Sequence, residues 1–249
     1  MKPILSKGNL PALEEFAAKR VLIAFDFDGT LAPLTSNPDG ASIRPSTRAL
    51  LRKLATFYPC IVVSGRSRTD VRRRLRGIAF QEIIGNHGIE PWNSSRAIAS
   101  AVETWIPAFR ERLKHFHGVV LENKRFSISV HYRHERRKLQ VRRAIAEAVR
   151  SIPGATLMGG KQVVNVIPKG APDKGLTVER IRKKRRLESV LYAGDDETDE
   201  TVFSRGRHAR YLTIRVGAKK TSLARYCIRS QKDIDRLLKV LIQLRRTQS

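Results

Sequence analysis

Two aspartates one residue apart, Asp26 and Asp28, follow the apolar run 21–25 and precede Gly29 and Thr30. Because successive side chains of a strand point to opposite faces, both carboxylates are expected to project to one side. A glycine in the following turn lets backbone N–H groups gather around an anion. Two acids beside an anion site indicate a cation between them, with Mg²⁺ as the expected metal and phosphate as the expected anion. The alternative is a capped strand-to-helix turn without a ligand.

Three further groups of polar residues could serve the same chemistry. Ser64 ends a second apolar run before Gly65 and Arg66, so its hydroxyl can donate to a phosphate oxygen, although an ordinary turn has the same pattern. Lys174 lies in the first turn of a predicted helix, where a cation opposes the helix dipole and needs an anionic partner unless solvent surrounds it. The run 195–200 holds five acids in six residues. Helix capping uses one or two acids, so this run indicates a metal site.

Three apolar runs that end at these polar residues, 21–25, 60–63 and 190–193, are typical strands of a parallel sheet covered on both faces. Helical patterns at 47–57 and 173–184 lie between them, which predicts an α/β fold with a doubly wound, mostly parallel sheet. Since ligands of such sheets bind beyond the carboxyl ends of the strands, the polar residues are expected to converge there.

The stretch 92–168 has a different pattern, with apolar and polar residues in alternation over 126–132. We expect a helix bent near Pro107, a hairpin, a basic amphipathic helix and a further strand, at residues 97–116, 118–122 with 126–132, 136–150 and 162–167. This pattern predicts a small inserted α+β cap domain over 92–168. The core is then formed by 1–91 and 169–249.

Charge and composition limit the classes of partner. The 249 residues include 49 Lys and Arg against 23 Asp and Glu, a net charge of +26 that favours anionic partners. No nucleic-acid reader motif accompanies the dispersed basic residues, so solvated helix faces are the alternative to non-specific polyanion binding. The two cysteines, Cys60 and Cys227, form no CxxC pair, and no apolar run reaches the roughly 18 residues of a membrane span. We expect a cytoplasmic monomer with free thiols.

The order and content of these four groups resemble the haloacid dehalogenase (HAD) phosphatase superfamily, and the chain is similar in particular to trehalose-6-phosphate phosphatases. That family carries DFDGTLAP, SGR, GxHG, E-x-K…HYR, P…KG and GDDxTDE segments. Their counterparts here are residues 26–33, 64–66, 85–88, 122–124 with 131–133, 168–175 and 194–200. The resemblance covers the core and the cap, and it implies a HAD Rossmann-like core and a role in trehalose biosynthesis.

The resemblance implies a role for each matching core residue. Asp26 would be the nucleophile that forms an aspartyl-phosphate, Asp28 the general acid and base, and Ser64 and Lys174 ligands of the phosphate. Further substrate contacts would come from Gly29, Thr30, Arg66 and His87, of which His87 is alternatively a loop-closing residue. Mg²⁺ would be bound by Asp26, the main-chain carbonyl of Asp28 and Asp195. Asp196 would be either a further ligand or a residue that supports the ligands, while Asp199 would support Lys174 or metal-bound water.

In the cap, the resemblance assigns the sugar hydroxyls to Glu122, Lys124, His131, Arg133 and Asn165. The family usually has Glu where this chain has Asn165, and Asn lacks the charge and a methylene of reach. The expected small-molecule partner is therefore trehalose 6-phosphate, or alternatively sucrose phosphate or a glycosyl-glycerate phosphate. A protein of another class, a non-enzymatic polyanion-binding protein on a HAD scaffold, is the remaining alternative.

Overall fold

The computed structural model describes residues 1–35, 40–160 and 162–247, which fold into two compact units. Unit 1 comprises Met1–His87 and Asp173–Ser249, and unit 2 comprises Gly88–Pro172. The sequence predicts the inserted domain over 92–168, so its two ends lie close to the limits of unit 2. None of the described helices is long and apolar enough to cross a bilayer.

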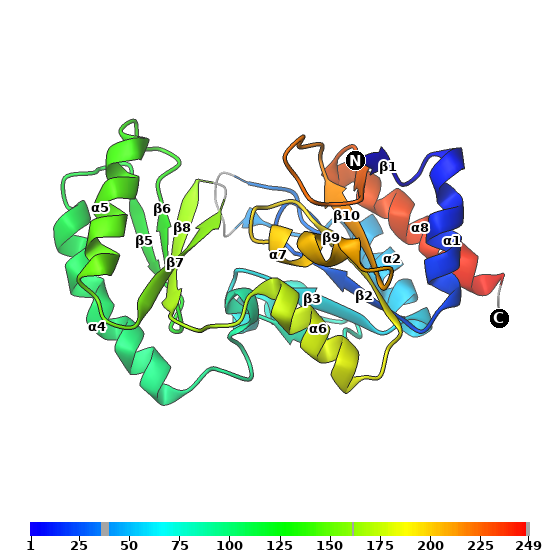
Figure 1. Ribbon diagram of the computed structural model, residues 1–249, viewed down its shortest axis with the longest axis horizontal. Helices are drawn as coiled ribbons and strands as arrows, with labels where there is room; N and C mark the ends of the chain where they lie inside the picture. Colours follow the sequence, from blue (N-terminus) through cyan, green and yellow to red (C-terminus); the bar gives the residue numbers. More distant parts are fainter. Residues whose placement is uncertain (36–39, 161, 248–249) are drawn as a thin grey trace. The chain divides into compact units, whose positions relative to one another are not determined.

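The described part of unit 1 contains a seven-stranded sheet in which all neighbouring strands are parallel (Figure 1). In spatial order its strands are β1 (Lys2–Pro3), β11 (Tyr226–Ile228), β10 (Tyr211–Val216), β9 (Ser189–Gly194), β2 (Val21–Phe25), β3 (Cys60–Val63) and β4 (Glu82–Ile84). The adjacent strands β9, β2 and β3 coincide with the three apolar runs, and all their residues are buried. The predicted α/β fold with a parallel sheet is confirmed.

Helices cover both faces of this sheet. The helices of unit 1 are α1 (Leu10–Ala18), α2 (Pro45–Phe57), α3 (Arg68–Arg74), α6 (Lys174–Lys184), α7 (Glu200–Phe203) and α8 (Ile234–Arg246), with short 3₁₀ turns at Lys7–Asn9, Asn86–Gly88, Ser204–Arg207 and Gln231–Asp233. On one face, α1 and α2 pack against α8 and share one apolar core with Ile23 and Phe25 of β2. On the other face, α6 packs against α7 (Figure 1). This two-sided cover explains why β9, β2 and β3 are continuous apolar runs.

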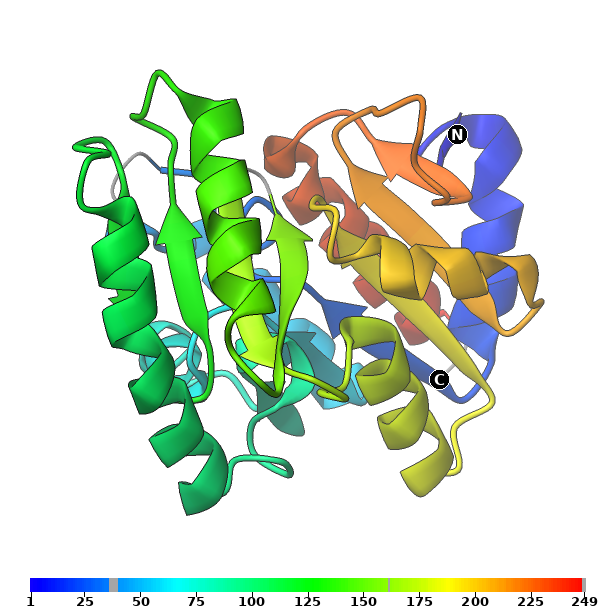
Figure 2. The same ribbon diagram turned by 60° about the vertical axis from the view of Figure 1, so that its left-hand side comes forward.

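Unit 2 contains an antiparallel four-stranded sheet with two helices on one of its faces (Figure 2). The strands are β5 (Val120–Asn123), β6 (Ile128–His131), β8 (Val163–Pro168) and β7 (Ala155–Gly160) in spatial order, and the helices are α4 (Arg96–Leu113) and α5 (Lys138–Arg150). Ile128 and Val130 of β6 pack against α4 and α5 residues such as Phe109 and Ile145. Both predicted helices and the predicted hairpin are confirmed. Strand β7 is absent from the sequence prediction because its Gly159 and Gly160 give no strand signal.

Strand register places the chemistry at one edge of the parallel sheet. Phe25, the last residue of β2, pairs with Ala193 of β9, and the N–H of Asp26 donates to the Ala193 carbonyl at 2.9 Å. Asp26 and Asp195 therefore leave neighbouring strands at the same level. Strand β2 lies between β9 and β3, where the chain order reverses, and such a switch point is where ligands of open α/β sheets bind.

Candidate active site

A buried lysine joins the first and last acidic segments of the sequence. The Lys174 ammonium donates to Asp26 Oδ1 at 2.7 Å and to Asp199 Oδ1 at 2.8 Å. All three side chains are buried, and Lys174 is only 2 % exposed. The anionic partner that the position of Lys174 requires is thus a pair of aspartates within the chain.

Close packing at the start of α6 places this lysine. The side chain of Asp173 accepts a hydrogen bond from the N–H of Leu176 at 2.7 Å and caps the helix. The N–H of Gly175 donates to Thr201 Oγ1 at 3.1 Å, and a side chain on Gly175 would overlap the Thr201 carbonyl. The glycine therefore lets the helix approach the acidic loop closely enough for Lys174 to reach Asp26.

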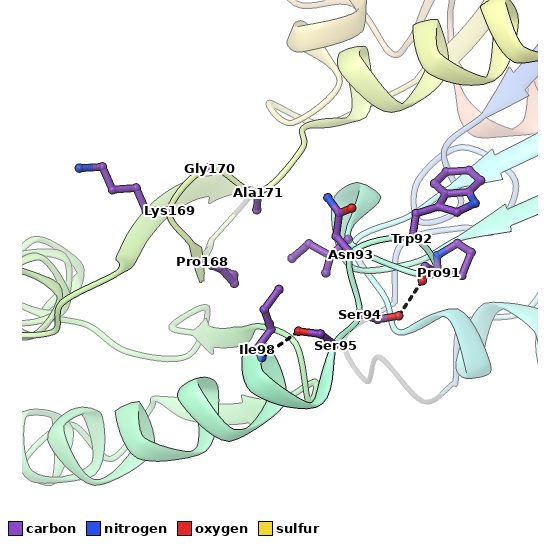
Figure 3. A pocket seen from close by; sticks show the side chains of 11 residues that line it. Pro91, Trp92, Asn93, Ser94, Ser95, Ile98, Pro168, Lys169, Gly170 and Ala171 are labelled. Carbon is purple, nitrogen blue, oxygen red and sulfur yellow. Dashed lines mark hydrogen bonds between the residues drawn. The ribbon is translucent and has the colours of Figure 1, made fainter.

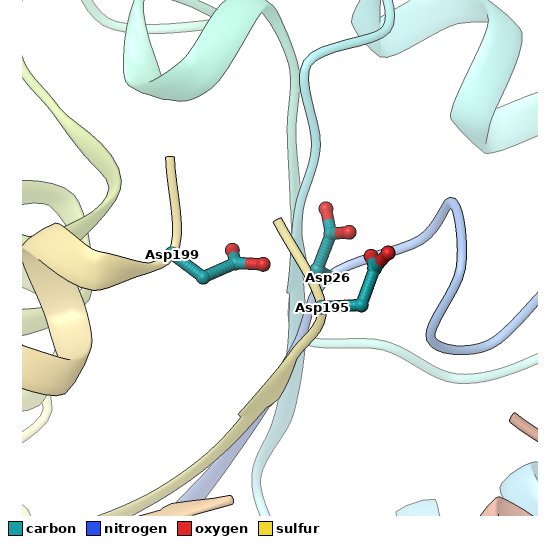
Figure 4. Close-up of side chains that lie close together, drawn as sticks. All are labelled: Asp26, Asp195 and Asp199. Carbon is teal, nitrogen blue, oxygen red and sulfur yellow. The ribbon is translucent and has the colours of Figure 1, made fainter. Parts of the chain in front are cut away.

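Three carboxylates gather at the carboxyl ends of β2 and β9. One oxygen each of Asp26, Asp195 and Asp199 lies within 4.8 Å of the others (Figure 4). Gly29, at φ 77°, faces this group, and a Cβ at that position would overlap the Asp195 carboxylate. Clustered carboxylate oxygens suit a hard divalent cation. The residues therefore fit a metal ion beside Asp26.

The protonation of these groups follows from their burial. Burial raises the pKa of Asp26 well above its usual range, and Asp199 and Asp195 raise it further, while Lys174 opposes them. Burial alone would lower the pKa of Lys174, but Asp199 and Asp26 outweigh it and raise that pKa. Burial also raises the pKa of Asp196. One ammonium among these carboxylates leaves the site short of positive charge, which a metal ion would supply.

Cations of the chain balance much of the acidic run 195–200. Besides the contact between Lys174 and Asp199, Lys219 lies 3.3 Å from Glu197, and Arg215 lies 2.9 Å from Glu200. These cations contact three of the five acids of the run, while Asp195 and Asp199 of the same run lie in the cluster that fits a metal ion. Asp26 and Asp195 are the carboxylates that most directly indicate a metal ion.

Arg215 also fixes the main chain of the acidic loop. Its guanidinium donates to the carbonyl of Asp195 and, at 3.5 Å, to that of Asp196. It extends from β10 at the position paired with Gly194 and is 7 % exposed. Sequence reasoning missed this residue. The available signal is a single charge inside an otherwise apolar buried strand, which needs a partner.

Asp199 links this loop to the core of the sheet. Tyr192, fully buried on β9, donates its hydroxyl to Asp199 Oδ1 at 2.6 Å. Asp199 Oδ2 accepts the N–H of Asp196 at 2.9 Å. A side chain on Gly194 would overlap the Asp199 carboxylate, so this glycine permits the contact. Together with the bond from Lys174, these contacts satisfy both oxygens of Asp199.

Asp28 belongs to a second ionic group. Both of its oxygens accept hydrogen bonds from Arg66, at 2.7 and 2.8 Å, so its carboxylate is not part of the three-aspartate cluster. Arg66 also donates to Asp70 at 2.9 Å. Burial would raise the pKa of Asp70, but bonds from Arg74, Arg66 and Arg73 outweigh it and bring the pKa to about 2. Asp70, which sequence reasoning missed, thus holds the arginine that binds Asp28.

From the sequence, the turn after Asp28 is expected to offer the main-chain N–H groups of Gly29 and Thr30 to an anion. The N–H of Gly29 donates to the Ala32 carbonyl at 2.8 Å, and that of Thr30 to the Phe27 carbonyl at 3.4 Å. Thr30 is fully buried. In this structure these two N–H groups close the turn, so the predicted anion cradle of Gly29 and Thr30 is not formed by them.

Ser64 and His87 come together on the neighbouring loops. Both are buried, Ser64 Oγ accepts the N–H of Arg66 at 3.1 Å, and the N–H of His87 donates to the Ser64 carbonyl at 2.9 Å. A side chain on Gly65 would lie 2.6 Å from the His87 ring. Asn86 and His87 both have left-handed backbone, with φ of 48° and 59°. Such strain in two successive residues is typical of functional sites, and His87 does close this loop.

The cap candidates lie in unit 2. Register aligns Glu122, Ser129 and Asn165 across three strands, on the sheet face opposite Val130. Ser129 Oγ donates to Asn165 Oδ1 at 2.6 Å, so Asn165 is buried and paired. Glu122 Oε2 lies 2.8 Å from His131 Nε2.

Two cap candidates flank these strands. Lys124 follows β5 directly and lies 3.6 Å from Glu122, while Arg133 follows β6 in a turn. Sequence reasoning missed Ser129. Its signal is the strand alternation that puts it on the same face as His131.

A cavity of about 380 Å³ in unit 2 contains none of these residues. It lies between the segment before α4 and the segment after β8, and its lining includes Trp92, Asn93, Ser94, Lys169 and Gly170 (Figure 3). In Figure 3 the Lys169 side chain extends away from Asn93 and Ser94. Its polar side chains do not converge on one point.

Comparisons with known proteins agree with the site. The family model described as trehalose-phosphatase matches residues 24–232. A probable trehalose-phosphate phosphatase of Oryza sativa is 27 % identical over 96 % of this chain and 72 % of its own length. A trehalose-phosphate phosphatase of Mycobacterium tuberculosis is 33 % identical over 80 % of this chain, which spans about half, 54 %, of that protein.

Solved structures share the fold. The C-terminal domain of the C. albicans trehalose-6-phosphate phosphatase aligns with a TM-score of 0.80 at 20 % identity, over 98 % of both chains. The sucrose-phosphatase of Synechocystis sp. PCC6803 aligns with a TM-score of 0.59 at 13 % identity, over 91 % of this chain and 98 % of that one. At these identities the likeness concerns the fold alone.

Proposed function

Because the chain belongs to the trehalose-phosphatase family, we propose that it hydrolyses trehalose 6-phosphate to trehalose and phosphate with Mg²⁺ as cofactor. The observation that carries this proposal is the buried contact of Lys174 with Asp26 and Asp199, beside Asp195. It combines a nucleophilic carboxylate, a phosphate-binding ammonium and oxygen ligands for a cation within one site.

In the first step Asp26 attacks the phosphorus atom. Its Oδ1 is held by Lys174, which leaves Oδ2 to form the bond to phosphorus while the bond to the sugar oxygen breaks. Lys174 and the hydroxyl of Ser64 bind the phosphate oxygens, where negative charge collects during transfer. Asp199 and Tyr192 keep the ammonium of Lys174 in place.

Asp28 moves the protons. It donates one to the leaving sugar oxygen, then takes one from the water that attacks the aspartyl-phosphate and releases phosphate. Since both Asp28 oxygens are bound by Arg66, Asp28 must leave the guanidinium to act as an acid. The substrate phosphate can take its place on Arg66, because guanidinium binds phosphate and carboxylate with the same two-pronged geometry.

Asp26, Asp195, Asp196 and the main-chain carbonyl of Asp28 would hold Mg²⁺, which neutralises phosphate charge when it is bound. Arg215 orients this loop through the carbonyls of Asp195 and Asp196. His87 shapes the loop that carries Ser64. The metal therefore depends on main-chain anchoring as well as on its carboxylate ligands.

Recognition of the sugar hydroxyls is assigned to unit 2, to Glu122, Lys124, His131, Arg133 and Asn165. One observation favours a second candidate substrate, another glycosyl phosphate such as sucrose phosphate or a glycosyl-glycerate phosphate. Asn165 stands where the family usually has Glu, and its carbonyl is occupied by Ser129. A site with fewer acceptors discriminates differently among sugars, because a hydroxyl without a partner is costly to bury.

The test is phosphate release from a panel of trehalose 6-phosphate, sucrose phosphate, glucosyl-glycerate phosphate, a mononucleotide and phosphoserine, each with and without Mg²⁺. We expect Mg²⁺-dependent activity that Asp26→Asn abolishes, with trehalose 6-phosphate as the best substrate. Absence of Mg²⁺-dependent release from every compound would refute the phosphatase proposal. A better disaccharide phosphate than trehalose 6-phosphate would refute the substrate alone, and Asn165→Glu should then shift the preference toward trehalose 6-phosphate.

A further inference from the structure

Helices α2 and α3 and the turn that follows α3 carry a concentration of arginines, most of which have no part in the phosphatase site. They are Arg48, Arg52, Arg72, Arg73, Arg74 and Arg76. Arg48 donates to the carbonyls of Arg74 and Arg76 at 2.7 and 2.8 Å, and Arg52 donates to that of Gly77 at 3.0 Å. Residues of α2 thus reach the main chain at the end of α3. We call this continuous region the α2–α3 arginine surface.

Among the residues that the structure describes, few carboxylates contact this surface. Asp70 is 2.8 Å from both Arg73 and Arg74, but it also pairs with Arg66. In the described part of the chain, Arg48, Arg52, Arg72 and Arg76 form no ion pair with a carboxylate. The carboxyl end of α3 attracts cations, but a helix terminus is equivalent to only about half a charge. These four arginines therefore exceed what the helix terminus can balance.

The surface is also suited to phosphate groups in particular. Every cation named in it is arginine, whose planar fork binds phosphate through two parallel hydrogen bonds. Arg48 and Arg52 are held by carbonyl acceptors, which fixes their position and reduces the entropy lost when they bind a ligand. Arg52, Arg72, Arg73 and Arg76 are exposed to solvent. A sugar phosphate offers one phosphate group, whereas a polymer with phosphate at each step can engage several of these arginines together.

We propose that the α2–α3 arginine surface binds the sugar–phosphate backbone of nucleic acid, independently of the phosphatase reaction. We expect contacts to the phosphates alone. The helices of this surface match no motif that reads base edges, and no aromatic residue lies between its arginines to stack on bases. The binding is thus sequence-independent and sensitive to salt. It assigns part of the net charge of +26 to one place on the molecule.

The test measures binding of a fluorescent duplex DNA oligonucleotide by anisotropy over a series of NaCl concentrations. The variant R48Q/R52Q/R72Q/R76Q is compared with the wild type and with R136Q/R142Q/R143Q/R150Q. The control set lies on and beside α5, is exposed and also forms no carboxylate ion pair among the described residues. Both variants lose four positive charges, so only the place of the charge differs.

If each arginine of the surface neutralises one phosphate, the slope of log K against log[NaCl] becomes shallower by about 3 to 4 in the surface variant. The control should change it by less than about 1. R72Q/R76Q, which removes no hydrogen bond of the described structure, should give about half of the full effect and guards against misfolding of the fourfold variant. Circular dichroism establishes that each variant is folded.

Equal losses in the two fourfold variants would overturn the proposal, because the charge would then act from the whole molecule. Absence of DNA binding at low salt would overturn it as well. Binding of the wild type to anionic lipid vesicles but not to DNA would show that the surface has a different partner. None of these outcomes depends on phosphatase activity.

Discussion

Replacement of Arg215 by methionine tests whether main-chain anchoring prepares the metal site. Methionine keeps the unbranched shape in a buried place but donates no hydrogen bond. The change removes the bonds to the carbonyls of Asp195 and Asp196 and leaves Glu200 without its cation. Loss of a hydrogen-bonded, partly buried ion pair typically costs about 2–3 kcal/mol of folding stability.

Whether Arg215→Met strengthens or weakens Mg²⁺ binding distinguishes an effect of charge from an effect of main-chain anchoring. Removal of a positive charge near carboxylates would by itself strengthen Mg²⁺ binding. If the acidic loop loses its anchor, part of the free energy of Mg²⁺ binding must instead be used to order the loop. A cost of about 1.4 kcal/mol for this ordering weakens the Mg²⁺ affinity tenfold. We therefore expect an approximately tenfold higher Kd for Mg²⁺ in Arg215→Met, measured by titration calorimetry on the metal-free protein.

The double variant Arg215→Met/Glu200→Gln is the matched control, because it removes both charges of the pair. It should recover part of the lost stability, since no half-buried carboxylate remains unpaired, but its Mg²⁺ affinity should stay low. A folded Arg215→Met protein that binds Mg²⁺ as tightly as the wild type would refute the anchoring role. So would a double variant whose affinity returns to that of the wild type, because the unpaired Glu200, and not the lost anchor, would then explain the weaker binding.

Three further predictions concern other contacts. Gly29→Ala should weaken Mg²⁺ binding and lower the melting temperature, because the new Cβ would overlap Asp195 and the backbone at this position has a left-handed φ. The strain should destabilise the folded protein by about 1–2 kcal/mol. Calorimetry that finds both the Mg²⁺ affinity and the melting temperature unchanged would contradict this geometry. Asp70→Asn should lower kcat about tenfold without changing the Kd for Mg²⁺, because the perturbed residue supports Arg66 and not the metal; an unchanged kcat in steady-state assays would argue against this support. Bonds from Arg182 bring the pKa of Glu179 to about 2 despite burial, so its contribution is complete above about pH 4.5 and is lost as the pH falls toward 2. Because solvent screens this partly exposed ion pair, Glu179→Gln should reduce the fall in unfolding free energy between pH 6 and pH 2.5 by only about 1 kcal/mol, and an identical fall in urea titrations of both proteins would rule out this linkage.

The sequence was sufficient to predict those helices and strands that are specified by neighbouring residues along the chain. Continuous apolar strands such as Val21–Phe25 are recognisable because both sheet faces are covered, and Asp173 and Lys174 mark a helix start. It failed for strand β7, because its pairing with β8 and not its composition makes it a strand. Edge strands such as Lys2–Pro3 are not predicted either, since two residues are too few to show the alternation of apolar and polar residues that identifies a strand.

The site divides in a similar way between what spacing and what contacts determine. Residue type and position are enough to identify Asp26, Asp28, Lys174 and Asp195 as candidates. In open α/β sheets the ligand-binding residues lie at the few positions that follow the carboxyl ends of the strands. Arg215 and Tyr192 are not, because their role depends on a neighbouring strand that register brings alongside. Residue type predicted a metal at the acidic run, and the distances add that cations from remote segments contact three of its five acids.

The two aspartates that end the first apolar strand show the division most clearly. The sequence by itself determined that Asp26 and Asp28 lie at a strand end in a phosphatase-like motif, because strand period and turn residues are local properties. Only the tertiary structure decided their partners, Lys174 for one and Arg66 for the other, since these lie 148 and 38 residues away. A carboxylate's chemistry depends on the charges within a few ångströms of it, and folding alone determines which charges those are.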